Sequence, residues 1–356
     1  MAVNLATKYS DKIATIFTKE SFLKGKTNES YDFTGAKTLK IYTPQTVPEN
    51  DYVRSGMNRY GEPTEMQDTV QELIMSQDKG FALTIDKGNN LDQMNTKGAG
   101  KMLQLQLKER SIPAADRYAL SQWVKFAGKV AGLSAKPTKS TVTEAVADAA
   151  QYFDDRLVPA EGRYLGVSGE MFKFLKLAPE WIGVDKLGEK SLEKGVVGEV
   201  QGMKVVKIPT SYLPADCYFV AWYKGSVMFP YKISDAKYHT DPPGLSGDLL
   251  EGRHYYDAFV LGAKADGVYA AVLGTKKQAT PSIEYSDPNI TITSSGAEKI
   301  VYTIDGSDPR YSDSAETYSA AVDTTSWTAG DYTIKAYATK NGNFTSDVFE
   351  KVITVS

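Results

Sequence analysis

Apolar residues recur at helical spacing on both sides of a single proline, Pro113. The apolar positions before and after it follow one another in steps of three and four, as residues on one helix face do: Met94, Gly98, Met102 and Leu105, then Ile112, Ala115, Ala119, Trp123 and Phe126. Proline lacks a backbone donor and clashes with the carbonyl four residues earlier. The pattern therefore predicts two helices that meet at a sharp turn, with Pro113 in the first turn of the second helix and Ser111 as its cap.

The chain before this helical region is mixed. Residues 4–17 fit one short helix with Leu5, Ile13 and Phe17 as its apolar positions, and residues 38–43 and 81–86 read as short strands. Between these strands, residues 44–80 are polar and lack a regular period. A connection this long inside a compact domain either has a function or is disordered.

The next segments alternate between helix and strand without a regular order. Residues 136–159 predict a helix, with Thr141 and Glu144 as a capping box. The apolar face of this helix is expected to hold Val146, Ala149, Ala150, Phe153 and Leu157. Residues 162–176 predict a strand that runs into a short helix capped by Ser168, and residues 198–233 and 254–273 read as several strands. The first 275 residues are therefore expected to be α+β.

The chain changes character after residue 275. Residues 276–280 are small and polar, as in a linker, and residues 281–356 consist of short β-branched and aromatic runs separated by Ser, Asp, Asn and Gly. This pattern predicts a small immunoglobulin-like (Ig-like) β-sandwich. From residue 280 onward there are 5 Lys and Arg against 11 Asp and Glu, whereas the preceding part holds 36 against 33. The net charges of −6 and +3 favour two modules that face different surroundings, although chance could also produce such a difference.

Composition excludes several classes of protein. The 356 residues, 42% of them hydrophobic, can bury a substantial core and allow two or three domains. No apolar run approaches the roughly 20 residues of a membrane helix, and the N-terminus lacks the layout of a secretory signal. We therefore expect a soluble, intracellular protein without a membrane partner. The single cysteine, Cys217, leaves no internal disulfide, so stability must come from packing or assembly.

Motifs for catalysis or metal binding are incomplete. The only histidines are His239 and His254, and the segments GVSGE and GLSGD each have an acid in place of the last glycine of a nucleophile elbow, which favours turns or caps. The segment NTKGAGKM resembles a phosphate loop but has Asn95 and Met102 at key positions. Zinc-type spacings of Cys and His are missing from the sequence.

Acidic residues leave two questions open. In DGSDP (residues 305–309), two aspartates could bind calcium, but Asp-Gly and Asp-Pro also form ordinary turns, which we favour. A carboxylate pair for glycoside hydrolysis cannot be recognised from spacing. We predict no catalytic, cofactor-binding or metal-binding residues and no enzymatic activity.

Five segments, in this order along the chain, carry a resemblance. They are FALTIDKGNNLDQ, KERSIPAADRYA, LVPAEGRYLGVSGEMFKFL, GEVQGMKVVKIPTSYLP and RHYYDAFVLGAKADGVYAAV. Their order resembles the major capsid proteins of tailed bacteriophages. Further on, VYTIDGSDPRYSDSAETY and DYTIKAYATKNGNFTS resemble the Ig-like domain found at the end of chitobiases.

The first resemblance implies the Hong Kong 97-like capsid fold over residues 1–275. It implies an extended loop at about 44–90, a two-stranded arm that reaches over a neighbouring subunit, and an axial domain at about 138–255. It also implies a spine helix at about 92–110, with Pro113 and Asp116 turning the chain out of it. The linker at 276–280 and the Ig-like domain at 281–356 would follow, and the latter would project outward.

The implied function is structural. Such a coat protein assembles with itself, as hexamers and pentamers, into an icosahedral head in the virion. The head would enclose double-stranded DNA through nonspecific contacts, with scaffolding and portal proteins as further partners and synthesis in the host cytoplasm. If the Ig-like domain is only a projection, deleting residues 277–356 should leave assembly intact, whereas replacing residues 45–80 should block it.

A carbohydrate- or surface-binding protein with an Ig-like accessory module is the alternative. The aromatic residues that could stack on sugars, or form the core of the sandwich instead, are Tyr302, Tyr311, Tyr318, Trp327 and Tyr332. Size in solution separates the two hypotheses, because a shell protein forms very large closed particles.

Overall fold

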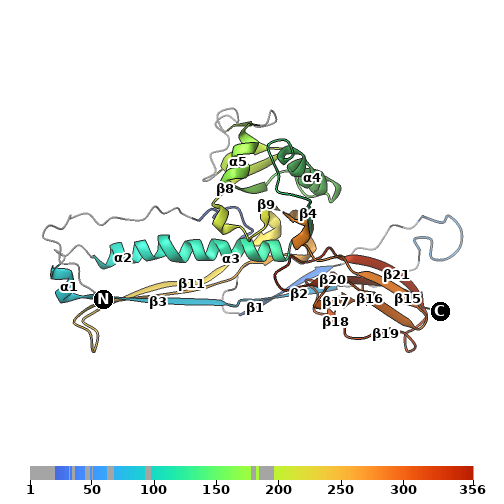
Figure 1. The fold of residues 1–356 in the computed structure, drawn as a ribbon. Coiled ribbons are helices and arrows are strands. Elements are labelled where there is room, and N and C mark those ends of the chain that lie inside the picture. Colours follow the sequence, from blue (N-terminus) through green and yellow to red (C-terminus); the bar gives the residue numbers. More distant parts are fainter. Residues whose placement is uncertain are drawn as a thin grey trace.

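A computed structural model describes residues 21–31, 33, 37–44, 49, 51–61, 68–92, 98–177, 182–183 and 196–355. Figure 1 shows a long helix above long strands, an upright part that carries α4 and α5, and a β-rich C-terminal part at the far end. The helix predicted for residues 4–17 falls outside the described ranges. The α+β class predicted for the first part of the chain is confirmed.

The helical region around Pro113 is one continuous helix. After the short α1 (Lys87–Asp92), the chain forms α2 (Ala99–Gln106), a π-helical turn η1 (Leu107–Ser111) and α3 (Ile112–Lys125), which follow one another without a break (Figure 1). The predicted sharp turn is therefore wrong, and the helix continues beyond its expected end at Arg110.

The π-turn explains why proline does not break this helix. The N–H of Ile112 donates to the carbonyl of Leu107, five residues earlier, which widens the turn just before Pro113. Ser111 has helical dihedrals, φ −67° and ψ −51°, and its side chain makes no cap. Asp116 does not turn the chain out of the helix either, because it lies within α3. Its buried carboxylate instead accepts hydrogen bonds from Ser21 Oγ at 2.7 Å and from the Phe22 N–H at 3.1 Å.

The largest sheet has seven strands. Its spatial order is β4 (Lys129–Leu133), β14 (Val268–Leu273), β9 (Cys217–Tyr223), β5 (Arg163–Ser168), β8 (Met203–Ile208), β7 (Val196–Val200) and β6 (Ile182–Gly183). The pairs β14–β4 and β5–β8 are parallel, and the other neighbouring pairs are antiparallel. The sheet therefore joins the strands predicted separately in residues 162–176, 198–233 and 254–273.

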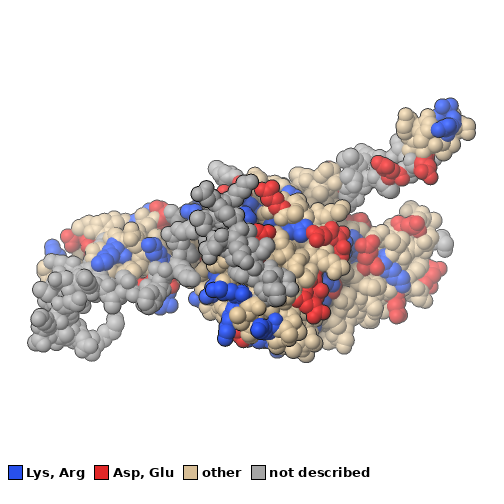
Figure 2. All heavy atoms as spheres, turned by 90° about the horizontal axis from the view of Figure 1, so that it is seen from above, with Lys and Arg blue, Asp and Glu red and all other residues tan. Residues whose placement is uncertain are grey.

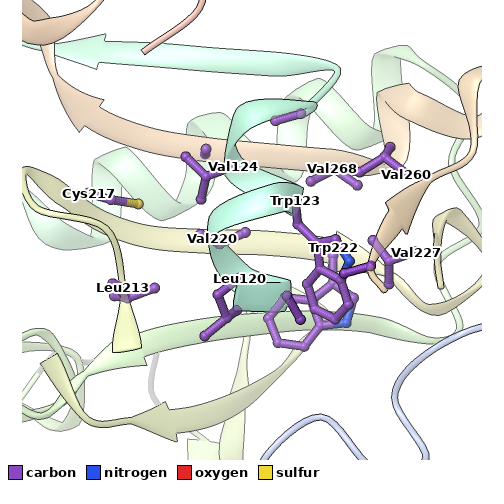
Figure 3. Packing of buried hydrophobic residues seen from close by; sticks show 14 of the residues in the cluster. Leu120, Trp123, Val124, Leu213, Cys217, Val220, Trp222, Val227, Val260 and Val268 are labelled. Carbon is purple, nitrogen blue, oxygen red and sulfur yellow. The ribbon is translucent and has the colours of Figure 1, made fainter. Parts of the chain in front are cut away.

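The two faces of this sheet carry different helices. Helix α3 covers one face, where Trp123 and Trp222 are fully buried with ring centroids 5.6 Å apart (Figure 3). Helices α4 (Val142–Asp155) and α5 (Gly169–Lys176) cover the other face. Because side chains alternate along a strand, Tyr164 joins the first cluster and its neighbour Leu165 the second. The sheet thus forms the centre of the hydrophobic core.

Helix α4 confirms the predicted periodicity except at its ends. Thr141 makes no side-chain cap; its Oγ1 instead accepts from the N–H of Thr138 at 2.9 Å, so the predicted capping box is wrong. Leu157 lies beyond the helix, with a φ of 55° and 89% of its surface exposed, and not on the apolar face. The predicted cap of α5 is confirmed, since Ser168 Oγ accepts from the N–H of Met171 at 3.3 Å.

A long three-stranded antiparallel sheet lies along the continuous helix formed by α2, η1 and α3, which we call the spine helix (Figure 1). Its order is β11 (Tyr231–Thr240), β12 (Gly247–Tyr256) and β3 (Gln77–Asp86). A separate two-stranded sheet pairs β1 (Thr38–Pro44) with β2 (Asp68–Ile74). Residues 44–80, predicted to be irregular, therefore contain β2 and the start of β3.

Short elements complete the part of the chain before residue 277, called the first part below. They are β10 (Val227–Met228), its partner β13 (Phe259–Val260), and the 3-10 turns η4 (Thr210–Tyr212), η5 (Lys224–Ser226), η6 (Gly262–Gly267) and η7 (Gly274–Lys276). The strand β13 lines one crevice together with β2, α3 and residues 310–313 of the C-terminal part.

The C-terminal part consists of two antiparallel sheets. One has the order β15 (Ser282–Ser286), β16 (Asn289–Thr293) and β19 (Val322–Asp323). The other has the order β18 (Glu316–Thr317), β17 (Lys299–Thr303), β20 (Gly330–Thr339) and β21 (Phe349–Val355). Ile292 and Ile334 belong to their shared core. This confirms the predicted all-β module, which we call the C-terminal module.

Candidate functional site

The serine and histidine motifs have structural roles. Ser168 caps α5, and Ser246 accepts through its carbonyl from the N–H of Lys87 at 3.0 Å. His239 is exposed and lies 3.2 Å from Glu251. Cys217 is buried, and burial raises the pKa of its thiol to about 12, so the thiol stays protonated. These groups do not form a nucleophilic site.

The DGSDP segment is a turn held by its own side chains. The carboxylate of Asp305 accepts from the N–H of Ser307 at 3.0 Å and from Ser314 Oγ at 2.7 Å. Burial opposes ionisation of Asp305, but hydrogen bonds from both serines outweigh it and lower its pKa. Asp308 is paired with Arg310 at 2.6 Å. In the described ranges no three acidic, His or Cys side chains are grouped as metal ligands.

The phosphate-loop-like segment is the start of a helix. Asn95 lies in the stretch 93–97 that the structure does not describe. Gly98 is the residue before α2, and Met102 donates through its N–H to the Gly98 carbonyl at 3.0 Å. The described part of this segment therefore has an ordinary helical role.

The strands β1 and β2 form an arm, defined here as residues 38–74, whose base is buried. The two strands pair from Thr38 opposite Ile74 to Pro44 opposite Asp68. At the base, Leu73 and Met75 belong to a small hydrophobic cluster with Phe33, Met228 and Leu261. The cluster anchors the arm to the body of the molecule.

The described tip of the arm, residues 51–61, exposes apolar side chains. The N–H of Val53 donates to the carbonyl of Arg59 at 3.0 Å, and the rings of Tyr52 and Tyr60 are 4.9 Å apart. Nevertheless Met57 is 95% exposed and Tyr60 84%. Figure 2 shows the arm extending well away from the body. Apolar groups on such a projection indicate a surface that is buried against another molecule.

An apolar groove of about 630 Å³ lies between residues 21–29, the spine helix and the long sheet. Leu23, Phe81 and Ile112 contribute to its walls. His254 lines it too, and its buried Nε2 has no partner among the described residues. Burial lowers the pKa of His254, which favours the neutral ring. The groove is a second surface suited to an apolar contact.

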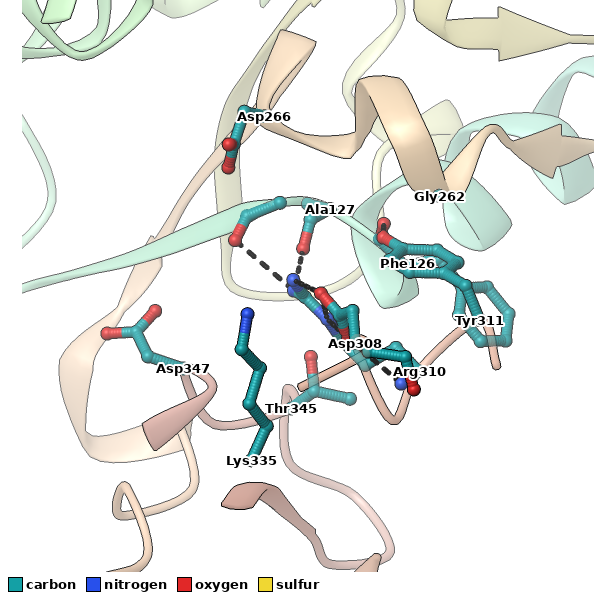
Figure 4. A network of polar contacts seen from close by, with 12 residues as sticks. Phe126, Ala127, Gly262, Asp266, Asp308, Arg310, Tyr311, Lys335, Thr345 and Asp347 are labelled. Carbon is teal, nitrogen blue, oxygen red and sulfur yellow. Dashed lines mark hydrogen bonds and ion pairs between the residues drawn. The ribbon is translucent and has the colours of Figure 1, made fainter. Parts of the chain in front are cut away.

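The C-terminal module is docked onto the end of the spine helix (Figure 4). Arg310 Nη1 donates to the carbonyls of Ala127 at 2.6 Å and Gly128 at 3.2 Å, just after α3 ends. Its guanidinium also pairs with Asp308, and its side chain is only 6% exposed. A cation near a helix C-terminus interacts favourably with the helix dipole and with carbonyls that lack helical partners.

Aromatic packing extends this docking contact. The Tyr311 hydroxyl donates to the carbonyl of Phe126, and the two rings lie 6.4 Å apart. Burial raises the pKa of Tyr311. Tyr311 and Phe344 both pack against the cluster that contains Trp123. The module therefore completes the hydrophobic core of the first part of the chain.

The residues predicted as a linker are tied down. The N–H of Gln278 donates to the Phe344 carbonyl at 3.0 Å, and the N–H of Phe344 donates to the Lys276 carbonyl at 2.7 Å. Asp347 lies 2.6 Å from Lys277 and 2.9 Å from Lys129. Burial would raise the pKa of Asp347, but the two lysines lower it overall. The connection is thus part of the docking contact.

The five aromatic residues considered for sugar stacking do not share one exposed surface. Tyr302 is buried, Tyr311 packs against the cluster that contains Trp123, and Tyr318, Trp327 and Tyr332 pack against the core of the sandwich. This arrangement favours a structural role for them. Acidic side chains are prominent on the side of Figure 2 where the C-terminal module lies, as the net charge of −6 leads one to expect.

Comparison with solved structures identifies the fold. A structure from Mycobacterium phage Che8 matches with a TM-score of 0.61 and 18% identity, and the match covers 76% of this chain and 98% of that chain. The mature capsid of bacteriophage PhiM1 matches with a TM-score of 0.58 and 15% identity over 75% and 91% of the two chains. The capsid of cyanophage P-SCSP1u matches with a TM-score of 0.57 and 13% identity, and the match covers 76% of this chain and 93% of that chain. These likenesses confirm the predicted phage capsid fold.

Sequence comparisons bear on the C-terminal module. Residues 290–353 match the family model described as Fn3 associated, consistent with the predicted Ig-like domain. No curated protein matches the chain. No described helix combines the length and apolar character needed to cross a membrane.

Proposed function

We propose that this chain is the structural major capsid protein of a tailed bacteriophage, located in the virion shell. The observation that carries the proposal is the extent of the match, which covers 76% of this chain and 98% of a phage structure. A chance similarity of one subdomain would not cover nearly the whole length of the phage chain. The role is structural and not enzymatic.

The arm supplies the contact between subunits in this proposal. A projecting arm on one copy and a groove on the next form a contact between two different surfaces, and repeated contacts of this kind close into rings when the rotation allows it. The exposed Met57 and Tyr60 at the tip would be buried in the shell. Hexamers and pentamers of the chain would then build an icosahedral head.

We propose the following division of the chain. Residues 1–275 would form the shell part, with the spine helix extended to Lys125. The extended loop expected at 44–90 would be the arm at residues 38–74, because β3 pairs with β12 in the long sheet, and the axial domain expected at 138–255 would end before β11 for the same reason. Residues 276–280 would join it to the Ig-like domain at 281–356, on the outer surface.

Other partners follow from the chemistry of a DNA-filled head. Packaged double-stranded DNA would meet the inner face through few, nonspecific and salt-sensitive contacts, as the weak charge of +3 allows. Scaffolding and portal proteins would assist assembly, and synthesis would take place in the host cytoplasm. No cofactor is required.

Electron microscopy and light scattering of the full chain, expressed alone and with lysate from infected host cells, test the proposal. We expect closed or tubular shells of uniform curvature in at least one condition. A matched variant with residues 45–67 replaced by a short glycine linker should remain a folded subunit without shells. A wild-type chain that stays monomeric in both conditions would contradict the proposal and favour the alternative, a carbohydrate- or surface-binding protein.

A further inference from the structure

The arm and the C-terminal module meet at one short backbone segment, residues 260–262. This segment contains the end of β13 and the first residue of η6. A crevice of about 410 Å³ has β2 on one side and the module residues from Arg310 to Asp313 on the other. The two projecting parts of the molecule therefore share a support.

Gln71 attaches the arm to this segment. Its Nε2 donates to the carbonyl of Val260 at 2.9 Å, and its Oε1 accepts from the N–H of Gly262 at 2.7 Å. The side-chain amide thus binds the backbone on both sides of Leu261, which itself packs with Leu73 of β2. Just after the arm, the N–H of Ser76 donates to Asp257, and the Tyr255 hydroxyl donates to the carbonyl of Met75 at 3.2 Å.

Tyr311 presses on the same segment from the module side. A Cβ placed on Gly262 would lie 2.8 Å from Cβ and 3.0 Å from Cγ of Tyr311, so only glycine leaves room for the close approach. Figure 4 shows Gly262 beside the docked Tyr311. Gly262 is therefore in contact with the module on one side and hydrogen-bonded to the arm on the other.

We propose that the docked C-terminal module positions the arm through Tyr311, Gly262 and Gln71. With Tyr311 in place, residues 260–262 have little freedom, and the amide of Gln71 is held in one geometry. When the tyrosine ring is absent, the segment can move and β2 loses a fixed support. In the isolated subunit this inference stands without the proposed function. It rests on the proposed function only for the consequence in a shell, where the module would direct the arm towards the neighbouring subunit.

Hydrogen exchange of the backbone amides in β1 and β2 tests this positioning in the unassembled full-length subunit. We expect Tyr311→Ala to accelerate exchange in both strands about tenfold. Tyr311→Phe keeps the ring against Gly262 and loses only the hydroxyl, so it should leave exchange in the arm within about twofold of wild type. Gln71→Leu, which removes both amide hydrogen bonds at similar volume, should accelerate exchange as Tyr311→Ala does.

A double variant separates a shared mechanism from two independent ones. If the module acts through Gln71, Tyr311→Ala combined with Gln71→Leu should exchange no faster than either single variant. The proposal would be overturned if the exchange rate of the double variant rose by the product of the two single effects. It would also be overturned if Tyr311→Ala left the exchange rates of β1 and β2 unchanged. Gly262→Ala is a second variant, because its added methyl group would push the ring of Tyr311 away from the segment. It should also accelerate hydrogen exchange in β1 and β2. Because no shell is needed, a negative result here is distinct from failure of the chain to assemble.

Discussion

The guanidinium of Arg310 donates a hydrogen bond of 2.6 Å to the carbonyl of Ala127, 183 residues earlier in the chain. The first residue belongs to a turn of the C-terminal module and the second follows the last turn of the spine helix. The module therefore satisfies backbone groups of the shell part that would otherwise be left without partners.

Replacing Arg310 should destabilise the whole chain. Arg310→Ala leaves Asp308 without its cation and two carbonyls without a donor, so we expect a loss of about 3–5 kcal/mol in the free energy of unfolding. Arg310→Lys keeps the charge but lacks the planar guanidinium that reaches Asp308 and both carbonyls at once, so its loss should be smaller than that of Arg310→Ala. Chemical unfolding followed by tryptophan fluorescence measures both. A loss below about 1 kcal/mol for Arg310→Ala would show that the docking contact is weak.

Deletion of residues 277–356 should impair the shell part, contrary to the expectation from sequence. The deletion removes Tyr311 and Phe344 from the core that contains Trp123 and exposes the apolar surface beneath them. We expect a lower melting temperature and few or misformed shells. Scanning calorimetry and electron microscopy of the truncated chain provide the measurement, and unchanged melting with normal shells would restore the simpler view of a detachable projection.

Two residues four positions apart in and after helix α4 should respond very differently to truncation. Phe153 is fully buried, and Phe153→Ala should cost about 3–5 kcal/mol. Leu157 is 89% exposed, and Leu157→Ala should change stability by no more than about 0.5 kcal/mol. Urea unfolding of the two variants measures both changes and tests whether α4 ends before Leu157. Comparable losses would mean that Leu157 is buried after all.

The docking contact should weaken in acid because of Asp347. Its pKa is lowered in the folded chain by Lys277 and Lys129, so the stability it contributes is present above the unfolded pKa of about 3.9 and is lost as the pH falls through the folded pKa. Asp347→Asn should therefore be less stable than wild type at pH 6, and the difference should shrink below about pH 4. Unfolding curves across this range measure it. A difference that stays constant with pH would exclude the two ion pairs as its cause.

The arm tip should matter for assembly and not for folding. Met57→Ser with Tyr60→Ser changes side chains that are 95% and 84% exposed, so the stability of the subunit should stay within about 0.5 kcal/mol. Shell yield should fall at least tenfold if the tip is buried between subunits. Val352→Ser, at an exposed position of the C-terminal module, is the control and should assemble normally. Equal yields for both variants would count against the tip as a contact.

Sequence periodicity predicted several elements that bury one face, but not β2, although its Leu73 is buried. The apolar positions of α4 from Val146 to Phe153 and the strand containing residues 81–86 were predicted in this way. The order of short motifs also indicated the capsid fold, which the comparisons confirm. The candidate site was less predictable, because exposed apolar residues at the arm tip have no period of their own.

The sequence by itself determined most of the helical and extended segments, although not β2, and the change from an α+β part to a C-terminal all-β part. These properties depend on neighbours a few residues away, within one face of one element. Only the tertiary structure decided that the helix continues past Pro113, because a π-helical turn just before it accommodates a proline without an N–H. It also decided that the C-terminal module packs against the end of the spine helix and is not attached by a free linker. Contacts such as Arg310 with Ala127 join residues far apart in the chain, so no local pattern contains them.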